Sequence, residues 1–319
     1  MTETPEQTGS ASTGRTVTVL RAGPLAVVAD LGRPGLAHLG VPRSGALDPP
    51  ALRLANRLVG NAEDAAGLEL LFGGLVLRAE KPTTVAVSGA PVPVFTRAGG
   101  VRRAVGSHRA VFLAEGDQLE VGEPVFGVRS YLSLNGGVAV PEVLGSRGTD
   151  LLSGLGPEPI RDGDRLPLGT PDGGPPACEP IVPVSAPPSW LSVPVFLGPR
   201  DDWFDDPAGV LRTGEWTVSP ASNRIGLRLS GHKVRRTPDR ESTELPSEPM
   251  LPGAMQVPPS GDPVIFLADG PTTGGYPVVG VIPAAALPLL AQLRPGSTLR
   301  FLPSRLDPGD PAPPEDDWY

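Results

Sequence analysis

The chain is poor in the residues that hold metals and form disulfides. Its 319 residues include a single cysteine, Cys178, so no intrachain disulfide can form. Its three histidines, His38, His108 and His232, are far apart in the sequence. No Cys/His cluster has the spacing of a zinc site. We therefore predict no bound metal ion.

Long apolar runs are also absent. No stretch approaches the roughly 18 apolar residues of a membrane span, and the polar N-terminus lacks the apolar segment of a signal peptide. Lysine is scarce, with only Lys81 and Lys233. The net charge of −8 argues against a nucleic-acid surface. These features predict a cytoplasmic protein with no membrane or nucleic-acid partner.

Glycine and proline are abundant, with 41 and 42 residues. Such a composition favours many turns and short strands over long helices. Short runs rich in β-branched and apolar residues, bounded by Gly, Pro or Asp, are the strand candidates. They lie at 16–22, 25–30, 75–79, 84–88, 92–97, 110–114, 118–121, 130–134, 193–197, 226–229, 264–268 and 298–302. The sequence therefore predicts a mainly β protein.

Three polar or Pro-rich segments suggest the domain organisation. Residues 1–14 lack periodicity and are expected to be disordered, as is the acidic, Pro-rich tail 307–319. The stretch 169–188 has the composition of a linker or long surface loop. We therefore expect a first subdomain over 15–185 and a second over 186–306.

Two helices are expected. The first covers 48–60, with Asp48 as N-cap and Gly60 as C-cap. Asn56 falls on its apolar face, either as a buried amide bonded to the backbone or as a group directed at a ligand. The sequence leaves these two explanations equally open. The second helix covers about 285–293 and has the pattern of a packing helix.

The usual nucleophile and phosphate motifs are missing: there is no G-x-S-x-G, Walker A or H-E-x-x-H sequence. A Gly/Pro-rich turn at 32–48 instead places backbone N–H groups at a helix entrance. It carries His38, Arg43, Ser44 and the helix cap Asp48. A buried, satisfied histidine is the simpler explanation for His38, between Ala37 and Leu39.

Two further polar segments occur in the second half. One is S-N-R-I-G at 222–226, which enters a strand. The other is the run 250–276, in which an apolar strand ends at Asp269 and a Gly-rich loop follows, a common layout of active sites. Together they contribute the candidates Asn223, Arg224, Gln256, Asp269, Thr272, Thr273, Gly274 and Tyr276.

Several motifs in this order resemble one family. They are D-L-G-R-P-G at 30–35, H-L-G-V-P-R-S-G-A-L-D at 38–48, L-A-N-R-L-V-G-N at 54–61, L-E-L-L-F-G-G at 68–74, N-G-G-V at 135–138, V-L-G-S-R-G-T-D-L at 143–151, S-N-R-I-G at 222–226, P-G-A-M-Q-V-P at 252–258 and T-T-G-G-Y-P at 272–277. The family comprises allophanate hydrolase subunit 2, Kip antagonist proteins, the C subunit of 5-oxoprolinase and the matching half of the urea carboxylase carboxyltransferase domain.

The resemblance implies two cyclophilin-like β-barrel subdomains with a few short helices. It also implies partners: a protein like allophanate hydrolase subunit 1 (the B subunit of 5-oxoprolinase) and, in the 5-oxoprolinase branch, a lactam-utilisation protein (the A subunit). The reaction implied there is ATP-dependent opening of 5-oxoproline to glutamate. The ATP requirement belongs to the complex, and its site is unknown.

The chain departs from the family pattern in two places. Gly270 and Pro271 replace an Arg and a Gln that many members carry, and Asn223 stands where Asp is common. The chain therefore lacks the usual Arg and Gln side chains at 270 and 271, and the site at 223 loses a charge.

Three functions follow from the resemblance. The leading one is the C subunit of 5-oxoprolinase acting on a small lactam or amide, because arginines and backbone N–H groups suit oxyanion stabilisation. The alternatives are a Kip-antagonist-like regulator that binds a kinase-inhibitor partner, and a carboxyltransferase component. Neither Lys81 (E-K-P) nor Lys233 (H-K-V) is flanked by methionines, so no biotin is expected on this chain.

Under the leading function the candidate residues divide into two groups. The expected catalytic residues are Asp269, Tyr276, Arg43 and His38. The expected substrate-binding residues are Ser44, Asn56, Asn223, Arg224, Gln256, Thr272, Thr273 and Gly274.

Overall fold

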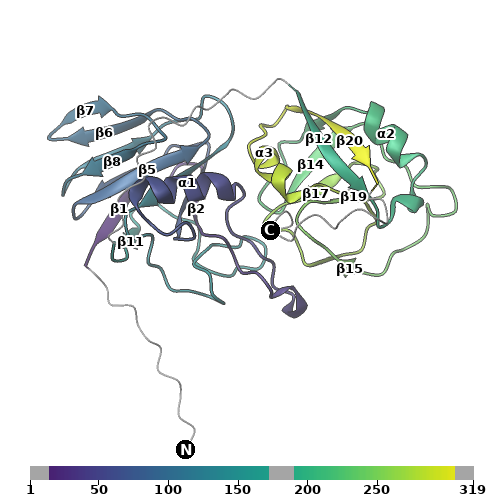
Figure 1. Ribbon diagram of the computed structural model, residues 1–319, viewed down its shortest axis with the longest axis horizontal. Coiled ribbons are helices and arrows are strands. Elements are labelled where there is room, and N and C mark those ends of the chain that lie inside the picture. Colours follow the sequence, from purple (N-terminus) through teal and green to yellow (C-terminus); the bar gives the residue numbers. More distant parts are fainter. Residues whose placement is uncertain (1–13, 172–189, 306–319) are drawn as a thin grey trace, which may run out of the picture.

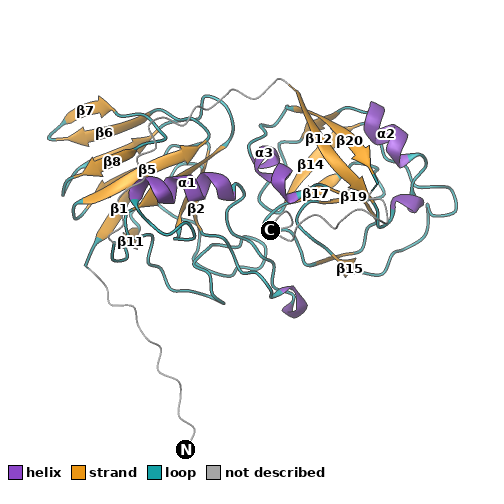
Figure 2. Ribbon diagram, viewed as in Figure 1, coloured by secondary structure: helices purple, strands orange, loops and turns teal. Residues whose placement is uncertain are grey.

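The computed structural model describes residues 14–171 and 190–305, which we call the first lobe and the second lobe. The figures show two β-rich bodies side by side, with helices α1 (Pro49–Val59) and α3 (Leu287–Ala291) at their boundary (Figures 1 and 2). The predicted disordered ends and most of the predicted linker lie outside the described residues. The subdomain boundary predicted at 185 also lies there.

The first lobe is built from two antiparallel sheets around one apolar core. Its six-stranded sheet has the order β11 (Arg165–Pro167), β1 (Thr16–Arg21), β4 (Val76–Ala79), β9 (Gln118–Val121), β6 (Val94–Ala98) and β7 (Val101–Ala104). Its five-stranded sheet has the order β2 (Leu25–Ala29), β3 (Gly67–Leu71), β10 (Arg129–Leu134), β5 (Thr83–Gly89) and β8 (Ala110–Leu113). Buried residues of both sheets form one hydrophobic cluster.

The second lobe is a closed seven-stranded barrel. Its strands are β12 (Trp190–Leu197), β19 (Val278–Val281), β16 (Ala254–Gln256), β17 (Val264–Phe266), β14 (Gly226–Gly231), β13 (Trp216–Val218) and β20 (Thr298–Ser304), in that order. Only the pairing of β12 with β20 is parallel among the described barrel strands. A small separate sheet pairs β15 (Glu248–Pro249) with β18 (Thr273–Gly274). The predicted mainly β fold class is confirmed.

The helices are few and short, as predicted. Besides α1 and α3 they are α2 (Pro207–Thr213) and the 3₁₀ turns η1 (Ala37–Leu39), η2 (Asp201–Trp203) and η3 (Ala284–Ala286). Helix α1 begins as predicted, because the Asp48 side chain accepts the backbone N–H of Ala51 at 3.1 Å. Gly60 ends it in the left-handed conformation at φ 73°. No helix in the described residues is long and apolar enough to cross a membrane.

The expected strands are all present, most of them with shifted ends, but several others went unpredicted. Strand β3 is buried on both faces, and Glu69 interrupts its apolar run. Strand β7 is exposed at every position and lies at a sheet edge, so its sequence shows no alternation. The barrel strands β13 and β16, with three residues each, are too short to produce a recognisable period.

Candidate functional site

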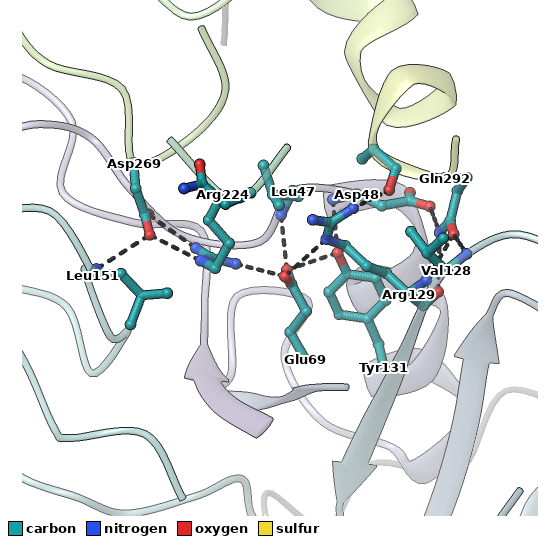
Figure 3. A network of polar contacts seen from close by, with 12 residues as sticks. Leu47, Asp48, Glu69, Val128, Arg129, Tyr131, Leu151, Arg224, Asp269 and Gln292 are labelled. Atoms are coloured by element: carbon teal, nitrogen blue, oxygen red, sulfur yellow. Dashed lines mark hydrogen bonds and ion pairs between the residues drawn. The ribbon is translucent and has the colours of Figure 1, made fainter. Parts of the chain in front are cut away.

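Three predicted site residues meet at the boundary of the lobes. The Ser44 hydroxyl, from the 32–48 turn of the first lobe, donates to Asp269 Oδ1 at 2.6 Å. Arg224 donates two hydrogen bonds to the same carboxylate, from Nε to Oδ2 at 2.9 Å and from Nη2 to Oδ1 at 3.0 Å. The backbone N–H of Leu151 also donates to Asp269 Oδ2 at 3.2 Å. Figure 3 shows the contacts of Arg224 and Leu151 with Asp269, which is fully buried.

The network continues into the first lobe through Glu69. Arg224 Nη1 donates to Glu69 Oε1 at 2.6 Å, and Arg129 Nε lies 3.3 Å from the same oxygen. The other oxygen accepts the Tyr131 hydroxyl at 2.8 Å and the Leu47 N–H at 3.0 Å. Arg224 therefore bridges one carboxylate from each lobe (Figure 3).

Helix α3 adds a second connection between the lobes. Gln292, just after this helix, donates to Asp48 Oδ2 at 2.8 Å and accepts the N–H groups of Val128 and Arg129 at 3.2 and 3.0 Å. The Arg129 guanidinium donates to the carbonyl of Ala291. The 285–293 segment therefore does more than pack: it ties the barrel to strand β10 and to the start of α1.

Burial and charge set the ionisation of this network. Burial alone would raise the pKa of Glu69, but the charges of Arg224 and Arg129 outweigh it and hold that pKa below its usual range. Burial raises the pKa of the Asp48 carboxyl despite its hydrogen bonds. Burial and the neighbouring carboxylates raise the pKa of Tyr131 well above its usual value. Tyr131 is therefore a neutral hydrogen-bond donor to an ionised Glu69.

Two of the sequence motifs form one loop assembly beside Ser44. Asp30 accepts the Ser146 hydroxyl and the N–H of Arg147, both at 2.7 Å. The buried guanidinium of Arg33 donates to the carbonyl oxygens of Val143 (2.9 Å) and Gly148 (2.6 Å). The D-L-G-R-P-G and V-L-G-S-R-G-T-D-L segments thus hold each other. The second segment also contacts Ser44, whose hydroxyl donates to the Thr149 carbonyl at 3.3 Å, and the second lobe, through the Leu151 N–H on Asp269.

A pocket of about 340 Å³ opens next to the buried network. The first lobe lines it with Leu31, Arg43, Ser44, Ala46, Leu47, Pro49, Pro50 and Arg53. The second lobe lines it with Pro252, Leu267, Ala268, Ala284, Ala285, Leu287 and Pro288. Ser44 belongs to both features, because it lines the pocket and its hydroxyl donates to Asp269. Its backbone N–H also donates to the carbonyl of Ala268, another pocket residue, at 3.0 Å. This pocket is the candidate ligand site.

The two other candidates of the 32–48 turn, Arg43 and His38, lie at different places in the structure. Arg43 lines the pocket. His38 lies on η1, where its ring contacts the Gly35 carbonyl at 3.0 Å and is exposed. The prediction of a buried His38 is therefore wrong, because the flanking Ala37 and Leu39 do not form a buried apolar face.

Asn56 is fully buried on α1, and the chain itself satisfies its amide. The Nδ2 group donates to the carbonyls of Glu63 (3.1 Å) and Ala65 (2.8 Å), and Oδ1 accepts from Asn61 at 3.2 Å. This is the first of the two explanations that the sequence left open. The side chain fixes the loop after α1.

Asn223 and Gln256 bond to groups other than the Asp269 carboxylate. Asn223 caps the entry to β14, with Oδ1 accepting the N–H groups of Ile225 and Gly226 at 2.9 and 3.2 Å. Gln256 donates to the Tyr276 carbonyl at 3.0 Å, while the Tyr276 side chain is 46% exposed.

The Gly-rich loop after Asp269 belongs to the small sheet. Thr273 and Gly274 form β18 and pair with β15, and the Thr272 carbonyl accepts the N–H of Met250 at 2.8 Å. The Cβ of any residue replacing Gly274 would lie 2.7 Å from Gln256 Nε2. A larger residue at 274 would therefore require the Gln256 amide to move.

Four network residues were not among the sequence candidates: Glu69, Arg129, Tyr131 and Gln292. Glu69 carried a usable signal, because a carboxylate in the middle of an apolar strand requires a buried cationic partner. Arg129 at the start of β10 carried the matching signal. Gln292 had none, since a polar residue at a helix end is usually solvated.

These features define a class. Residues 39–303 match the family described as Carboxyltransferase domain, subdomain A and B, and the chain belongs to this family. Among curated proteins it is 36% identical to the C subunit of the Escherichia coli 5-oxoprolinase over 294 residues, which cover 91% of both chains. It is 32% identical to the corresponding C subunit of Haemophilus influenzae over 86% of this chain and 87% of that protein.

Larger relatives contain the same unit as a part. The urea amidolyase of Lachancea kluyveri is 33% identical over 85% of this chain, a match that spans 16% of that protein. The crystal structure of the Kluyveromyces lactis urea carboxylase superposes with a TM-score of 0.82 at 31% identity, covering 90% of this chain and 27% of the other. The crystal structure of TTHA0988 superposes with a TM-score of 0.80 at 32% identity, covering 93% of this chain and 57% of the other.

Among residues 14–171 and 190–305 no group of three or more His, Cys, Asp or Glu side chains comes together as a metal site. The charged groups at the lobe boundary neutralise one another as ion pairs instead.

Proposed function

We propose that this chain is the C subunit of a 5-oxoprolinase. The proposal rests on the extent of the sequence match, because the match to the E. coli protein spans 91% of both chains. The urea amidolyase match spans only 16% of that relative. A chain that matches a separate subunit over this extent is expected to work as one, with partners like the A and B subunits of that enzyme.

The proposed reaction is the ATP-dependent opening of 5-oxoproline to glutamate by the assembled complex. Opening a lactam requires stabilisation of the oxyanion that forms at the ring carbonyl, which arginines and backbone N–H groups provide. Arg43, at the pocket wall, is the candidate for contact with substrate. Ser44, Arg224 and Asp269 are better suited to positioning, because they are buried and bonded to one another.

The remaining candidates differ in whether their positions allow direct contact with a substrate in the pocket. Tyr276 and His38 are exposed side chains outside the residues that line the pocket. We propose that they, with Thr272 and Thr273, contact a partner protein or substrate only in the complex. Asn56, Asn223, Gln256 and Gly274 are assigned to local structure.

The test is glutamate formation from 5-oxoproline and ATP by the partner proteins, measured with and without this chain. We expect glutamate to form only when the chain is present. Ring opening by the partners without it, at the rate of the full set, would remove this chain from the reaction.

A carboxyltransferase component is the second candidate function. The TM-score of 0.82 with the Kluyveromyces lactis urea carboxylase favours it. It predicts carboxyl transfer from a carboxybiotin carrier to a small amide such as urea, with biotin on another protein. Transfer of label from a carrier already loaded with labelled carboxybiotin to urea, leaving free biotin on the carrier, would support this function over lactam opening.

A further inference from the structure

We propose that the pocket between the lobes binds a small organic carboxylate, with Arg43 and Arg53 holding the carboxylate group and the apolar walls holding its ring or chain. We name 5-oxoproline as the physiological ligand, and that part of the inference rests on the proposed function. The pocket chemistry itself follows from the residues that line it.

The polar groups of the pocket select for an anion. Of the described residues that line it, Arg43 and Arg53 are the charged ones, and both are cationic. Arg53 lies 3.8 Å from Glu63 and the pair is about half exposed, so the contact is weak and open to exchange for a ligand carboxylate. An arginine fork binds a carboxylate through two parallel hydrogen bonds.

The start of helix α1 supplies no competing donors. Pro49 and Pro50 line the pocket and have no N–H, while the next N–H, that of Ala51, is already bonded to Asp48. The helix end therefore cannot act as a general phosphate cradle. Recognition of an anion falls to the two arginine side chains.

Apart from Ser44, the remaining walls are apolar and come from both lobes. Proline, leucine and alanine side chains dominate, including Pro252, Leu287 and Pro288 from the barrel. A volume of about 340 Å³ is near the lower end of the roughly 300–1,000 Å³ range of small-molecule sites. The fitting ligand is thus small, with one anionic end and an apolar body.

The floor of the pocket is held rigid by the buried network. Ser44 lines the pocket, donates its hydroxyl to Asp269 and its N–H to Ala268, and so connects the wall to the ion pair with Arg224. A ligand therefore meets a preformed surface and loses little affinity to ordering the protein.

The test is isothermal titration of the full chain, and of the assembled complex, with three probes: 5-oxoproline, cyclopentanecarboxylate and the neutral cyclopentanecarboxamide. We expect both carboxylates to bind about tenfold or more tightly than the carboxamide, because only they engage the arginines. Arg43→Gln and Arg53→Gln should each weaken carboxylate binding and leave the carboxamide unchanged. Arg103→Gln, on the exposed strand β7, is the matched control and should behave as wild type.

Thermal midpoints confirm that the variants fold, and Arg53→Gln changes a half-exposed side chain that is safe to replace. Equal binding of carboxylate and carboxamide would overturn the proposal. So would wild-type affinity in the Arg43→Gln/Arg53→Gln double variant, or no carboxylate binding by either chain or complex.

The two proposals can fail separately. A complex that does not open 5-oxoproline, but whose cyclopentanecarboxylate binding is lost in the arginine variants, rejects the proposed function and retains the pocket. A complex that opens 5-oxoproline with unchanged affinity in those variants retains the function and rejects the pocket.

Discussion

Glu69 illustrates what single residues do at the lobe boundary. It is 3% exposed, and its ionised form persists because Arg224 and Arg129 lie on one side and the Tyr131 hydroxyl on the other. Replacing a buried ion pair as a unit can cost little, whereas removing one partner leaves an uncompensated charge. The network is therefore most sensitive to single substitutions.

Glu69→Gln is expected to lower the free energy of unfolding at pH 7 by about 3–5 kcal/mol, because Arg129 and Arg224 lose their shared carboxylate. The pKa of Glu69 is depressed in the folded state. Its contribution is therefore complete above the unfolded pKa of about 4.3 and is lost as the pH falls through the folded value. Urea unfolding of both proteins at pH 7 and at about pH 3.5 measures the difference.

The difference between wild type and variant should shrink at the lower pH. The raised pKa of Asp48 acts in the opposite direction in both proteins, and because burial rather than the Glu69 charge is its main cause, most of that effect cancels in the comparison. A difference that stays constant between the two pH values would contradict an ionised Glu69.

Residue types could be predicted at the site more readily than their roles. Ser44, Arg224 and Asp269 were found from polar segments beside Gly-rich turns, and they do meet. Their burial could not be predicted, because Glu69, the second carboxylate partner of Arg224, lies on a strand distant in sequence. Nothing in the sequence around His38 distinguishes a core histidine from one on a projecting 3₁₀ turn.

At the scale of elements, the 32–48 turn depends on glycine geometry. Gly32 and Gly35 both have φ of 82°. A Cβ on Gly32 would collide with the carbonyl oxygens of Arg43 and Ser44, whereas a Cβ on Gly35 would meet open space. Substitutions at the two glycines therefore distinguish the cost of the left-handed backbone conformation from the cost of a steric clash.

Gly35→Ala is expected to cost about 1–2 kcal/mol, because a residue with a side chain must then adopt the left-handed conformation. Gly32→Ala should cost about 1–3 kcal/mol more, because the turn must also shift away from the new methyl group. Chemical denaturation of the two variants side by side measures this. Equal destabilisation would mean that the turn is not packed against Gly32 as described.

Helices and strands were predicted correctly where the hydrophobic period and the residues at the ends of the element agreed. Helix α1 has its cap, its apolar face and its glycine end in the sequence, and all three are present in the structure. Strand β3 was missed because its burial on both faces removes the alternation and Glu69 breaks the apolar run. The pairing of β18 with β15 depends on tertiary contacts that no local pattern records.

At the scale of the whole molecule, Arg224 connects the two lobes. It is 2% exposed, and it contacts Asp269 in the barrel as well as Glu69 and the Gly45 carbonyl in the first lobe. We expect the lobes to unfold together in wild type because their boundary contains these paired charges.

Arg224→Met should uncouple the lobes, because it leaves Glu69 without one cation and Asp269 without its main partner. Scanning calorimetry should then show two resolved transitions, or one broadened transition at lower temperature, in place of a single one. Arg300→Ala, which removes an exposed pair with Glu215 inside the second lobe, is the control and should change the profile little. A single unshifted transition in Arg224→Met would show that the network does not join the lobes.

The most direct measurement of the proposed role is 5-oxoproline-dependent ADP release by three samples: this chain by itself, the partner proteins by themselves, and the assembled complex. We predict substrate-dependent release from the complex only. Full activity of the isolated chain, or undiminished activity of the partners without it, would contradict the assignment of this chain as a 5-oxoprolinase C subunit.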